Sequence, residues 1–363
     1  MADAPSGPSG VDSEAARAVI VSAVEAKAFP CAVVEVGTTA GAVWTEAFGT
    51  LTGEPDGPAA TPATIFDLAS LTKVIATTTL AMRLCDEGRL ALDQPVGRWC
   101  PAWCGTDRDH VTVADLLAHC AGLTAHLPLY ESLQGRTEFV EAICRLALEY
   151  EPRRRAVYSD LGFILLGVIL EQAGGRDLGV QFGAIAKGWT SEPLAFSPPR
   201  SWRDRIAPTG VDRWRGRLLV GEVHDRNCWV LGGRAGHAGL FGTAAAVGRF
   251  ARLVLAAIRQ DDPTLASPDT VRLFARRTPI PGSTRALGWD TMKPTSSCGA
   301  LMSTTAIGHT GFTGTSLWID YERDLYAVLL TNRVHPSAEN QHILSVRPAF
   351  HDAVVAAWPR TGL

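Results

Sequence analysis

Apolar and polar residues follow two different periods along this chain, and the period depends on position. Residues 13–28 place apolar residues at helical spacing, whereas residues 31–37 and 41–51 are typical of two strands joined by a Thr-Thr-Ala-Gly turn. The chain is therefore predicted to start with a helix and then a hairpin that opens a sheet.

The middle of the chain is mostly helical by pattern. Small and apolar residues from Leu71 to Leu84 predict a buried helix that ends near Gly88. Strands are expected again only near the end, at residues 287–292, 306–320 and 324–334, before a closing helix at 342–358. Further helices are predicted at residues 113–119, 138–150, 161–174, 243–259 and 267–277.

Strands at both chain ends with helices between them predict an α+β fold, in which both ends build one antiparallel sheet flanked by helices and a mostly helical lobe is inserted. We expect a disordered tail at residues 1–12, an α/β lobe from residues 13–84 and 281–363, and a helical lobe from residues 85–280. A functional site is expected between the lobes.

Composition narrows the possible partners. The 363 residues are 46% hydrophobic and 20% charged, with a net charge of -3, which is typical of an ordinary globular protein and disfavours nucleic acid as a partner. The N-terminal residues show neither a basic nor an apolar targeting region, so we expect a cytoplasmic protein that does not engage membranes. A small molecule or short peptide is the expected partner, and the oligomeric state is open.

The eight cysteines are expected to be reduced thiols, mostly small core residues. The cluster of Cys100, Cys104, His110, His119 and Cys120 offers an alternative, a metallohydrolase, but its spacing fits no common zinc pattern. We therefore expect neither a metal nor a cofactor.

Ser70 and Lys73 form the first motif that carries chemistry, in the stretch Ala-Ser-Leu-Thr-Lys. Three residues apart on a helix, their side chains share a face, so the amine is a candidate base for the hydroxyl. The helix start adds backbone amides that favour negative charge. Alone the motif is weak, because a capping serine and an exposed lysine are common at this spacing.

Two further motifs follow along the chain. Tyr158, in Tyr-Ser-Asp, precedes a long apolar helix, and its phenol could shuttle a proton if nearby positive charge lowers its pKa; simple packing is the alternative. His309 begins His-Thr-Gly on a predicted strand, where Gly311 lets a ligand approach the backbone. The amide of Phe312 is a natural oxyanion donor beside that of Ser70.

In this order and spacing, the three motifs resemble the serine β-lactamase and penicillin-binding protein superfamily, most closely its class C β-lactamase-like branch. That branch also holds D,D-carboxypeptidases, D-aminopeptidases and esterases. The flanking segments resemble a bacterial subgroup of serine hydrolases or D,D-carboxypeptidase-like proteins. The resemblance covers about residues 28–355, including the stretches FDLASLTKVIAT, AVYSDLGFILLG, GGRAGHAGLFGTA and GHTGFTGTSLWID.

The resemblance implies roles for individual residues. Ser70 would be the acylated nucleophile, and Lys73 and Tyr158 would share the transfer of its proton to the leaving group. His309 would stand where many relatives carry a lysine. Substrate would lie along Thr310 and Gly311, with the amides of Ser70 and Phe312 forming the oxyanion hole.

Two departures from the commonest family pattern carry consequences. Asp160 stands where many relatives have asparagine, so it can hold Lys73 as an ammonium but cannot donate to a substrate; Tyr158 should then take more of the base role. His309, unlike a lysine, is expected to change its charge near neutral pH, so the field at Tyr158 should vary with pH.

Several other charged residues have both a structural and a functional interpretation. Arg153, Arg154 and Arg155 could steer an anionic substrate or form a solvated face, and Arg333 could bind a substrate carboxylate or form an internal salt bridge. His224, Asp225 and His237 could line the cleft or brace a loop, and the structural interpretation is favoured. His119 is expected to be structural.

The sequence therefore predicts a metal-independent serine hydrolase that forms an acyl-enzyme on Ser70 and cleaves a peptide or amide, of D-Ala-D-Ala or muropeptide type, or a small ester. The alternatives are a non-hydrolytic penicillin-binding-like sensor or scaffold, or a weak β-lactamase. Because fold alone does not settle function, the scissile bond stays open.

Overall fold

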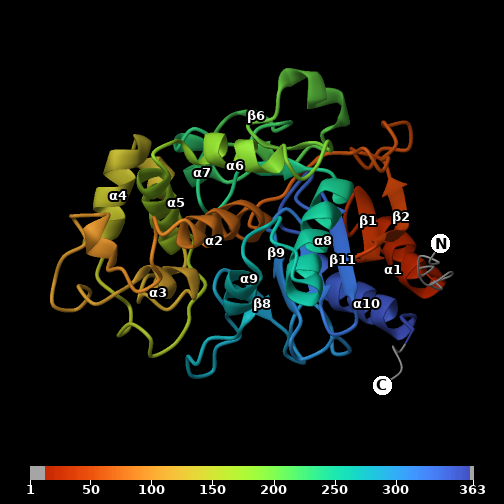
Figure 1. The fold of residues 1–363 in the computed structure, drawn as a ribbon. Helices are drawn as coiled ribbons and strands as arrows, with labels where there is room; N and C mark the ends of the chain where they lie inside the picture. Colours follow the sequence, from red (N-terminus) through yellow and green to blue (C-terminus); the bar gives the residue numbers. More distant parts are fainter. Residues whose placement is uncertain (1–12, 360–363) are drawn as a thin grey trace.

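A six-stranded antiparallel sheet organises the molecule in the computed structural model, which describes residues 13–359 (Figure 1). Strands from both chain ends are neighbours in it, as the sequence predicts, and the α+β fold is confirmed. The predicted tail at residues 1–12 lies outside the described residues. In spatial order the strands are β2 (Gly41–Gly49), β1 (Cys31–Thr38), β11 (Leu325–Thr331), β10 (Ser316–Asp320), β9 (Ile307–Thr310) and β8 (Asp290–Thr291).

Helices cover both faces of this sheet. Helices α1 (Glu14–Glu25) and α10 (Ile343–Ala356) pack against each other on one face, and α8 (Ala244–Gln260) lies across β1 and β11 on the other (Figure 1). Successive side chains of a strand point to opposite faces of the sheet. Val33 of β1 therefore joins the core under α8, whereas Val34 joins the core under α1 and α10. Both faces are thus buried, which explains why every residue of β1 is buried.

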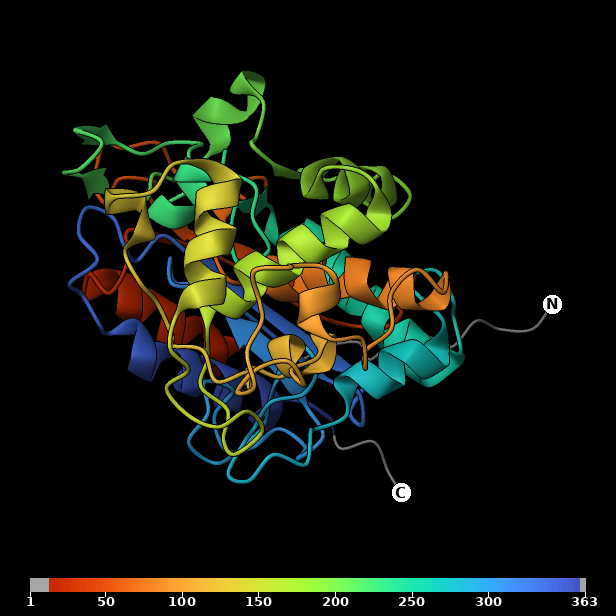
Figure 2. The same cartoon turned by 90° about the vertical axis from the view of Figure 1, so that its left-hand side faces the viewer.

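The remaining helices gather at the far end of the molecule, and Figure 2 looks onto them with the sheet behind. Helix α5 is central to this group and packs against α2, α3, α4 and α6. These helices are α2 (Thr79–Asp86), α3 (Val113–Leu117), α4 (Gly135–Arg145), α5 (Asp160–Gly174), α6 (Leu178–Ala186) and α7 (Arg226–Val230), while α9 (Pro268–Ala275) packs beside α8.

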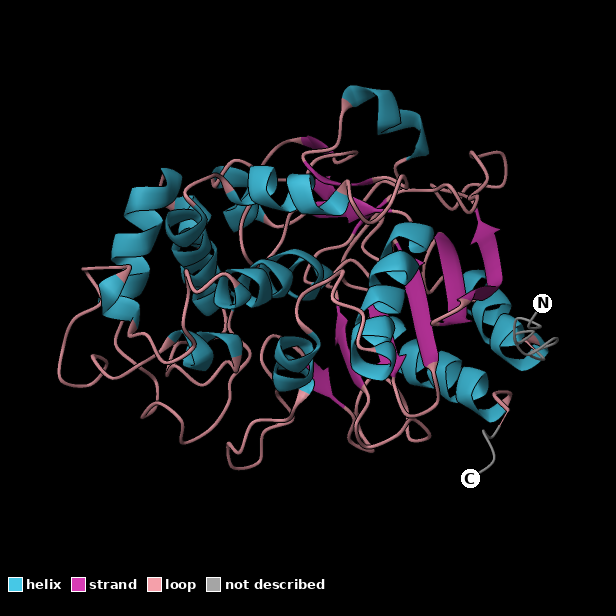
Figure 3. Cartoon of the chain, in the orientation of Figure 1, coloured by secondary structure: helices cyan, strands magenta, loops and turns pink. Residues whose placement is uncertain are grey.

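Two predictions about strands are wrong. Short strands do occur within residues 85–280, and two small sheets flank the main one (Figure 3). Residues 306–320 form two strands with a tight turn between them, because the glycines of that segment let the chain reverse. The small sheets contain β3 (Phe66–Asp67), β7 (Leu240–Gly242) and β4 (Leu194–Phe196) in one, and β5 (Val211–Asp212) and β6 (Arg217–Leu218) in the other.

The helix predicted from Leu71 to Leu84 is not uniform, since a π-helical segment η1 (Lys73–Thr78) precedes α2. Such segments are frequent at functional sites. The lobe boundaries near residues 84 and 280 stay predictions, although α8, assigned to the helical lobe, packs on the sheet through its apolar face. Within residues 13–359, none of the helices is both long and apolar enough to cross a membrane.

Candidate active site

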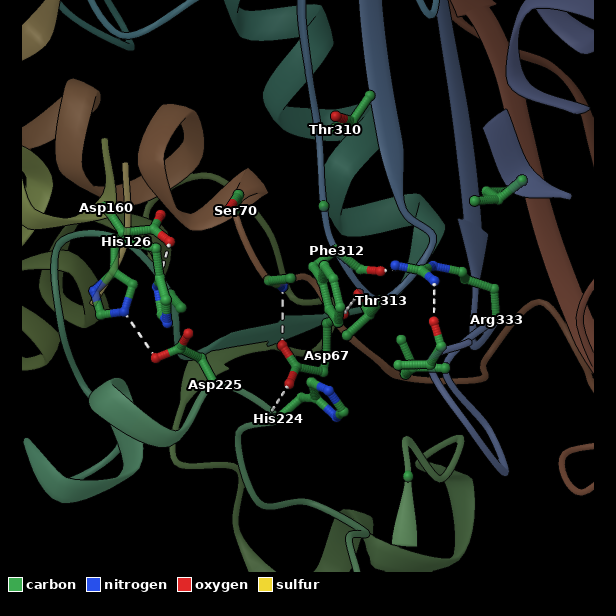
Figure 4. A pocket seen from close by; sticks show the side chains of 18 of the residues that line it. Asp67, Ser70, His126, Asp160, His224, Asp225, Thr310, Phe312, Thr313 and Arg333 are labelled. Atoms are coloured by element: carbon green, nitrogen blue, oxygen red, sulfur yellow. Dashed lines mark hydrogen bonds and ion pairs between the residues drawn. The ribbon is translucent and has the colours of Figure 1, made fainter. Parts of the chain in front are cut away.

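Ser70 lies on a sharp elbow between β3 and the helix that begins at Leu71. The preceding residue, Ala69, has φ +47°, a left-handed conformation that costs energy for any residue but glycine. Asp67 holds this conformation, because its Oδ1 accepts the Ala69 amide at 2.9 Å. The elbow exposes the Ser70 hydroxyl at the wall of a cavity of about 1200 Å³ (Figure 4).

Two side chains contact the Ser70 hydroxyl directly. Lys73 Nζ donates to Ser70 Oγ at 3.0 Å, and Tyr158 Oη donates to the same oxygen at 2.8 Å. The structure thus brings together three residues that the sequence separates by up to 88 positions.

Lys73 is buried and all three of its ammonium protons have acceptors. Besides Ser70, they reach Asp160 Oδ1 at 2.8 Å and the carbonyl of His237 at 2.9 Å. Burial by itself would lower the pKa of Lys73, but the Asp160 charge reverses this and leaves that pKa above its usual value. Burial likewise opposes ionisation of Asp160, yet Lys73 holds the pKa of this carboxyl well below its usual range. The predicted stabilisation of the Lys73 ammonium by Asp160 agrees with this geometry.

The start of α5 positions Tyr158 and Asp160 together. Ser159 caps the helix, with its Oγ accepting the Gly162 amide at 3.3 Å, and Asp160 occupies the first turn, where a carboxylate complements the helix dipole. The cap leaves Tyr158 on the preceding loop, pointing back toward Ser70, which explains the spacing in Tyr-Ser-Asp.

The positive charge near Tyr158 does not bring the pKa of its phenol below the usual value. Burial raises the pKa of Tyr158, and the nearby Lys73 charge offsets this only in part. Lys73 Nζ lies 4.9 Å from the Tyr158 ring centroid, and the Arg285 guanidinium lies 5.2 Å from it. Tyr158 is therefore a phenol in the resting protein, with two cations at its ring.

His309 lies on β9 with its ring centroid 5.6 Å from that of Tyr158. Its Nδ1 lies 2.8 Å from the carbonyl oxygen of Thr310, and its Nε2 has no hydrogen-bond partner within residues 13–359. Burial, together with the charges of Lys73 and Arg285, holds the pKa of His309 well below its usual range. The expectation that its charge changes near neutral pH is wrong for the unliganded protein, because the imidazole is buried beside cations.

The turn after β9 presses against the Ser70 elbow. A Cβ at Gly311 would lie 2.7 Å from the Leu68 carbonyl oxygen and 3.2 Å from Ala69 Cβ, so only glycine permits this approach. Thr313 Oγ1 donates to the Asp67 carbonyl at 2.7 Å and fixes the turn further.

The predicted oxyanion and substrate residues lie at this same turn. Among hydrogen bonds within the described residues, the amides of Ser70 and Phe312 donate none, so both remain available to a ligand. Thr310, Gly311 and Phe312 all line the cavity.

The cavity also contains residues that sequence reasoning missed. Arg285 is one, and its only recorded ion pair in residues 13–359 is a long 4.0 Å contact with Asp290. His126 is another: its Nδ1 lies 3.5 Å from Asp160 Oδ2, and that contact raises the pKa of His126. Arg285 lies in none of the segments that resemble the family. His126 lies in one of them, residues 116–130, but nothing in that segment indicates its contact with Asp160.

His224, Asp225 and His237 line the cavity, and they also hold parts of the active site in place. His237 Nε2 lies 2.9 Å from Asp225 Oδ1, while the His237 carbonyl holds Lys73. The His224 amide donates to Asp67 Oδ2 at 2.7 Å. Asp225 and His237 therefore position Lys73, and His224 helps to position the elbow.

The arginine cluster before Tyr158 has the structural role. Arg153 pairs with Asp115 at 2.7 Å, Arg154 pairs with Glu151, and none of Arg153, Arg154 and Arg155 lines the cavity. His119 is also structural: it is buried, and its Nδ1 accepts the Ser159 amide at 3.0 Å.

Arg333 lines the cavity but is held by backbone carbonyls, those of Phe312, Ala338 and Asn340, each at 2.9 Å. Of the two alternatives for Arg333, the internal salt bridge is not found among the residues that the structure describes, and carbonyl contacts take its place.

The cysteine cluster does not assemble into a metal site. Within residues 13–359, the histidine, cysteine and carboxylate groups close enough to hold an ion are His126, Asp160 and Asp225, whose ligand atoms lie within 4.8 Å of one another. Asp160 already pairs with Lys73 and Asp225 with His237, so a cation there would compete with both contacts. The metallohydrolase alternative based on cysteines therefore has no support from the geometry.

An antiparallel sheet joined to a helical region, with a serine, lysine and tyrosine meeting at their junction, defines the active-site-serine class of β-lactamase-like proteins. The chain belongs to the Beta-lactamase family, whose model matches residues 16–347. This is a serine hydrolase family.

Two curated relatives share the name "Putative D-alanyl-D-alanine carboxypeptidase". The protein of Escherichia coli (strain K12) is 31% identical, over 78% of this chain and 72% of the relative. The one of Salmonella gallinarum (strain 287/91 / NCTC 13346) is 30% identical, over 78% and 73%.

Solved structures support the fold. EstCE1, a hydrolase with promiscuous acyltransferase activity, superposes with a TM-score of 0.75 at 21% identity, covering 94% of this chain and 98% of the other. A class C β-lactamase from Rhodobacter sphaeroides has the same TM-score at 20% identity, covering 94% and 99%. At such identities the likeness establishes the fold alone.

Proposed function

We propose that this protein is a hydrolase that forms an acyl-enzyme on Ser70. The observation that carries the proposal is the double contact of the Ser70 hydroxyl with Lys73 Nζ at 3.0 Å and Tyr158 Oη at 2.8 Å, at the wall of the cavity. A serine needs a proton acceptor within this reach to attack a carbonyl.

The state of these groups supports Tyr158 as the acceptor. The ammonium of Lys73 has no free lone pair and commits its protons to Ser70, Asp160 and the His237 carbonyl. The reactive form is then the small fraction in which Tyr158 is a phenolate, stabilised by the cations Lys73 and Arg285. Activity should therefore rise with pH through neutrality into the alkaline range.

In the proposed acylation, Ser70 Oγ bonds to the substrate carbonyl carbon while its proton passes to the Tyr158 phenolate. The carbonyl oxygen becomes an oxyanion facing the amides of Ser70 and Phe312. The bond to the leaving nitrogen or oxygen then breaks, and Tyr158 returns the proton to that atom. Water hydrolyses the ester on Ser70 by the same steps in reverse order.

For the scissile bond we propose a peptide or amide of D-Ala-D-Ala or muropeptide type, with small esters as the alternative. The names of the curated relatives support the peptide. Arg285 supports it too, because the leaving group of such a peptide ends in a carboxylate. Arg285 is a cation beside Tyr158 whose ion pair among the described residues is a long one, to Asp290.

Covalent labelling tests the nucleophile. A fluorophosphonate probe and a labelled penicillin should each add one label per chain, mapped to Ser70, and Ser70→Ala should remove it. Absence of labelling in the folded wild type would refute the acyl-enzyme and favour a non-hydrolytic binding protein.

A substrate panel tests the bond. It should contain p-nitrophenyl esters, D-Ala-D-Ala peptides, muropeptides and nitrocefin, with Ser70→Ala as the blank. Arg285→Gln should raise KM for peptides with a free terminal carboxylate by roughly tenfold while leaving uncharged esters nearly unchanged. Arg98→Gln is the matched control, because Arg98 is an exposed arginine outside the cavity. Equal effects of Arg285→Gln on both substrate types would contradict the peptidase assignment.

A further inference from the structure

An exposed aromatic ring stands beside the proposed oxyanion position. The side chain of Phe312 is 55% exposed, although large apolar side chains are normally buried. Its ring is stacked on His224, with centroids 5.7 Å apart, and the Arg333 guanidinium lies 4.5 Å from its centroid (Figure 4). The ring is thus held between two neighbours while much of it faces the cavity.

The neighbours of Phe312 are themselves fixed. Arg333 is buried and bonds three backbone carbonyls, including that of Phe312 at 2.9 Å. His224 is tied to Asp67, three residues before Ser70, through its amide. A ring held this way loses little conformational freedom when it binds a ligand, so it is preorganised.

Two more exposed apolar side chains line the same cavity, Val211 at 58% and Leu344 at 64% exposure. Val211 follows Gly210, where an added Cβ would lie 3.4 Å from the His224 ring. Leu344 lies three residues before Arg347, which donates to the Gly311 carbonyl at 2.6 Å, so both occupy one face of α10.

Exposed apolar side chains from three separate segments therefore line the cavity that contains the turn at Gly311 and Phe312. Such a surface, continuous with a nucleophile, is typical of a ligand subsite.

We propose that Phe312, Val211 and Leu344 form a subsite for an apolar or aryl group on the acyl part of the substrate. This inference rests on the proposed acyl-enzyme mechanism. Tyr158 must protonate the leaving group, so the leaving group lies toward Tyr158, His309 and Arg285. The acyl substituent then extends past the Phe312 amide, over the Phe312 ring.

The test is a series of p-nitrophenyl esters with one leaving group and different acyl groups: acetate, butyrate, hexanoate and phenylacetate. After normalisation to hydroxide hydrolysis, kcat/KM of the wild type should rise by roughly tenfold from acetate to hexanoate and phenylacetate. Phe312→Ala should remove most of this rise, and Phe312→Leu should keep the hexanoate preference but lose much of the phenylacetate preference.

Leu344→Ala should reduce the hexanoate preference by a smaller factor. Leu273→Ala, which truncates another exposed leucine on α9 outside the cavity, should change nothing. Fluorophosphonate labelling of Ser70 separates the two proposals. If labelling persists but the wild type shows no acyl preference, or Phe312→Ala slows every ester equally, the subsite is refuted and the serine mechanism stands. If Ser70 is not labelled, the proposed function itself fails.

Discussion

Two clusters in this protein contain the same three kinds of side chain, a carboxylate, a cation and a tyrosine. One is Asp160, Lys73 and Tyr158 beside the cavity. The other is Glu35, Arg252 and Tyr326, between β1, β11 and α8, where Tyr326 Oη donates to Glu35 Oε1 at 2.7 Å and Arg252 donates to the same oxygen at 3.1 Å.

The clusters differ in what completes them. In the sheet cluster, Arg252 also donates to Tyr326 Oη at 2.6 Å, and Gly248 of α8 closes over Glu35 so tightly that any side chain there would clash. No member of that cluster lines the cavity at the active site. At the active site, the tyrosine and the cation both point to a fourth residue, Ser70, which does line the cavity. Chemistry thus depends on the fourth partner and its access to substrate.

The balance of forces on the two carboxylates also differs. Burial outweighs Arg252 and raises the pKa of Glu35, whereas Lys73 outweighs burial and lowers the pKa of Asp160. The ammonium of Lys73 is a compact charge at 2.8 Å from Asp160, while Arg252 approaches Glu35 with one nitrogen at 3.1 Å. The ion pair at the active site is therefore the closer of the two.

The largest difference should appear between two tyrosine variants. Tyr158→Phe should reduce the acylation rate of Ser70 by roughly 10²–10⁴-fold, because it removes the proton acceptor. Tyr326→Phe should leave that rate unchanged and lower the free energy of unfolding by about 2–3 kcal/mol, because it removes the hydrogen bonds of the hydroxyl with Glu35 and Arg252. Stopped-flow acylation and urea denaturation measure the two quantities. Near-normal acylation by Tyr158→Phe would contradict the claim that the active-site cluster, unlike the sheet cluster, takes part in the reaction.

The next largest difference is expected between Asp160→Asn and Glu35→Gln, in the pH profile of kcat/KM. The Asp160 charge raises the pKa values of both Lys73 and Tyr158, so Asp160→Asn should move the alkaline limb of kcat/KM to lower pH, with roughly a tenfold change in rate for each pKa unit. Glu35→Gln should leave the pH profile in place. Thermal melting of both variants checks the fold, and a limb that stays in place in folded Asp160→Asn would show that Asp160 does not control the proton transfer.

Smaller effects are expected at His309. Because its pKa is held well below the usual range, the neutral variant His309→Gln should keep the shape of the pH profile between pH 6 and 8, to within a few-fold in rate. His309→Lys adds a charge near Tyr158 and should move the alkaline limb to lower pH by a fraction of a unit. A wild-type limb between pH 6 and 7 that disappears in His309→Gln would mean that His309 does titrate there.

The sequence predicts which residues form the site better than it predicts which of them are charged. Ser70, Tyr158 and His309 each belong to a short motif, so local chemistry reveals them. Arg285 reaches the cavity from a segment without a motif. The contacts of both Arg285 and His126 depend on how distant elements pack.

Protonation states and the shortest strands also depend on tertiary packing, so the sequence does not predict them. Whether Tyr158 or His309 is charged depends on burial, which spacing along the chain does not encode. Strands of two or three residues, such as β3 and β7, are too short to show a period.

The last comparison concerns Asp67, a buried carboxylate that accepts hydrogen bonds from amides and has no ion pair among the described residues. Burial raises its pKa to about 6, against about 3.9 in an unfolded chain. Between these values the folded state binds more protons than the unfolded state, so the free energy of unfolding should fall as pH rises from 4 to 6. Asp67→Asn should remove this slope in urea titrations, and exposed Asp93→Asn should preserve it. If the free energy of unfolding changes with pH in the same way in wild type and Asp67→Asn, the hydrogen bonds from the Ala69 and His224 amides offset the cost of burying Asp67. This carboxylate would then need no cation, unlike Asp160.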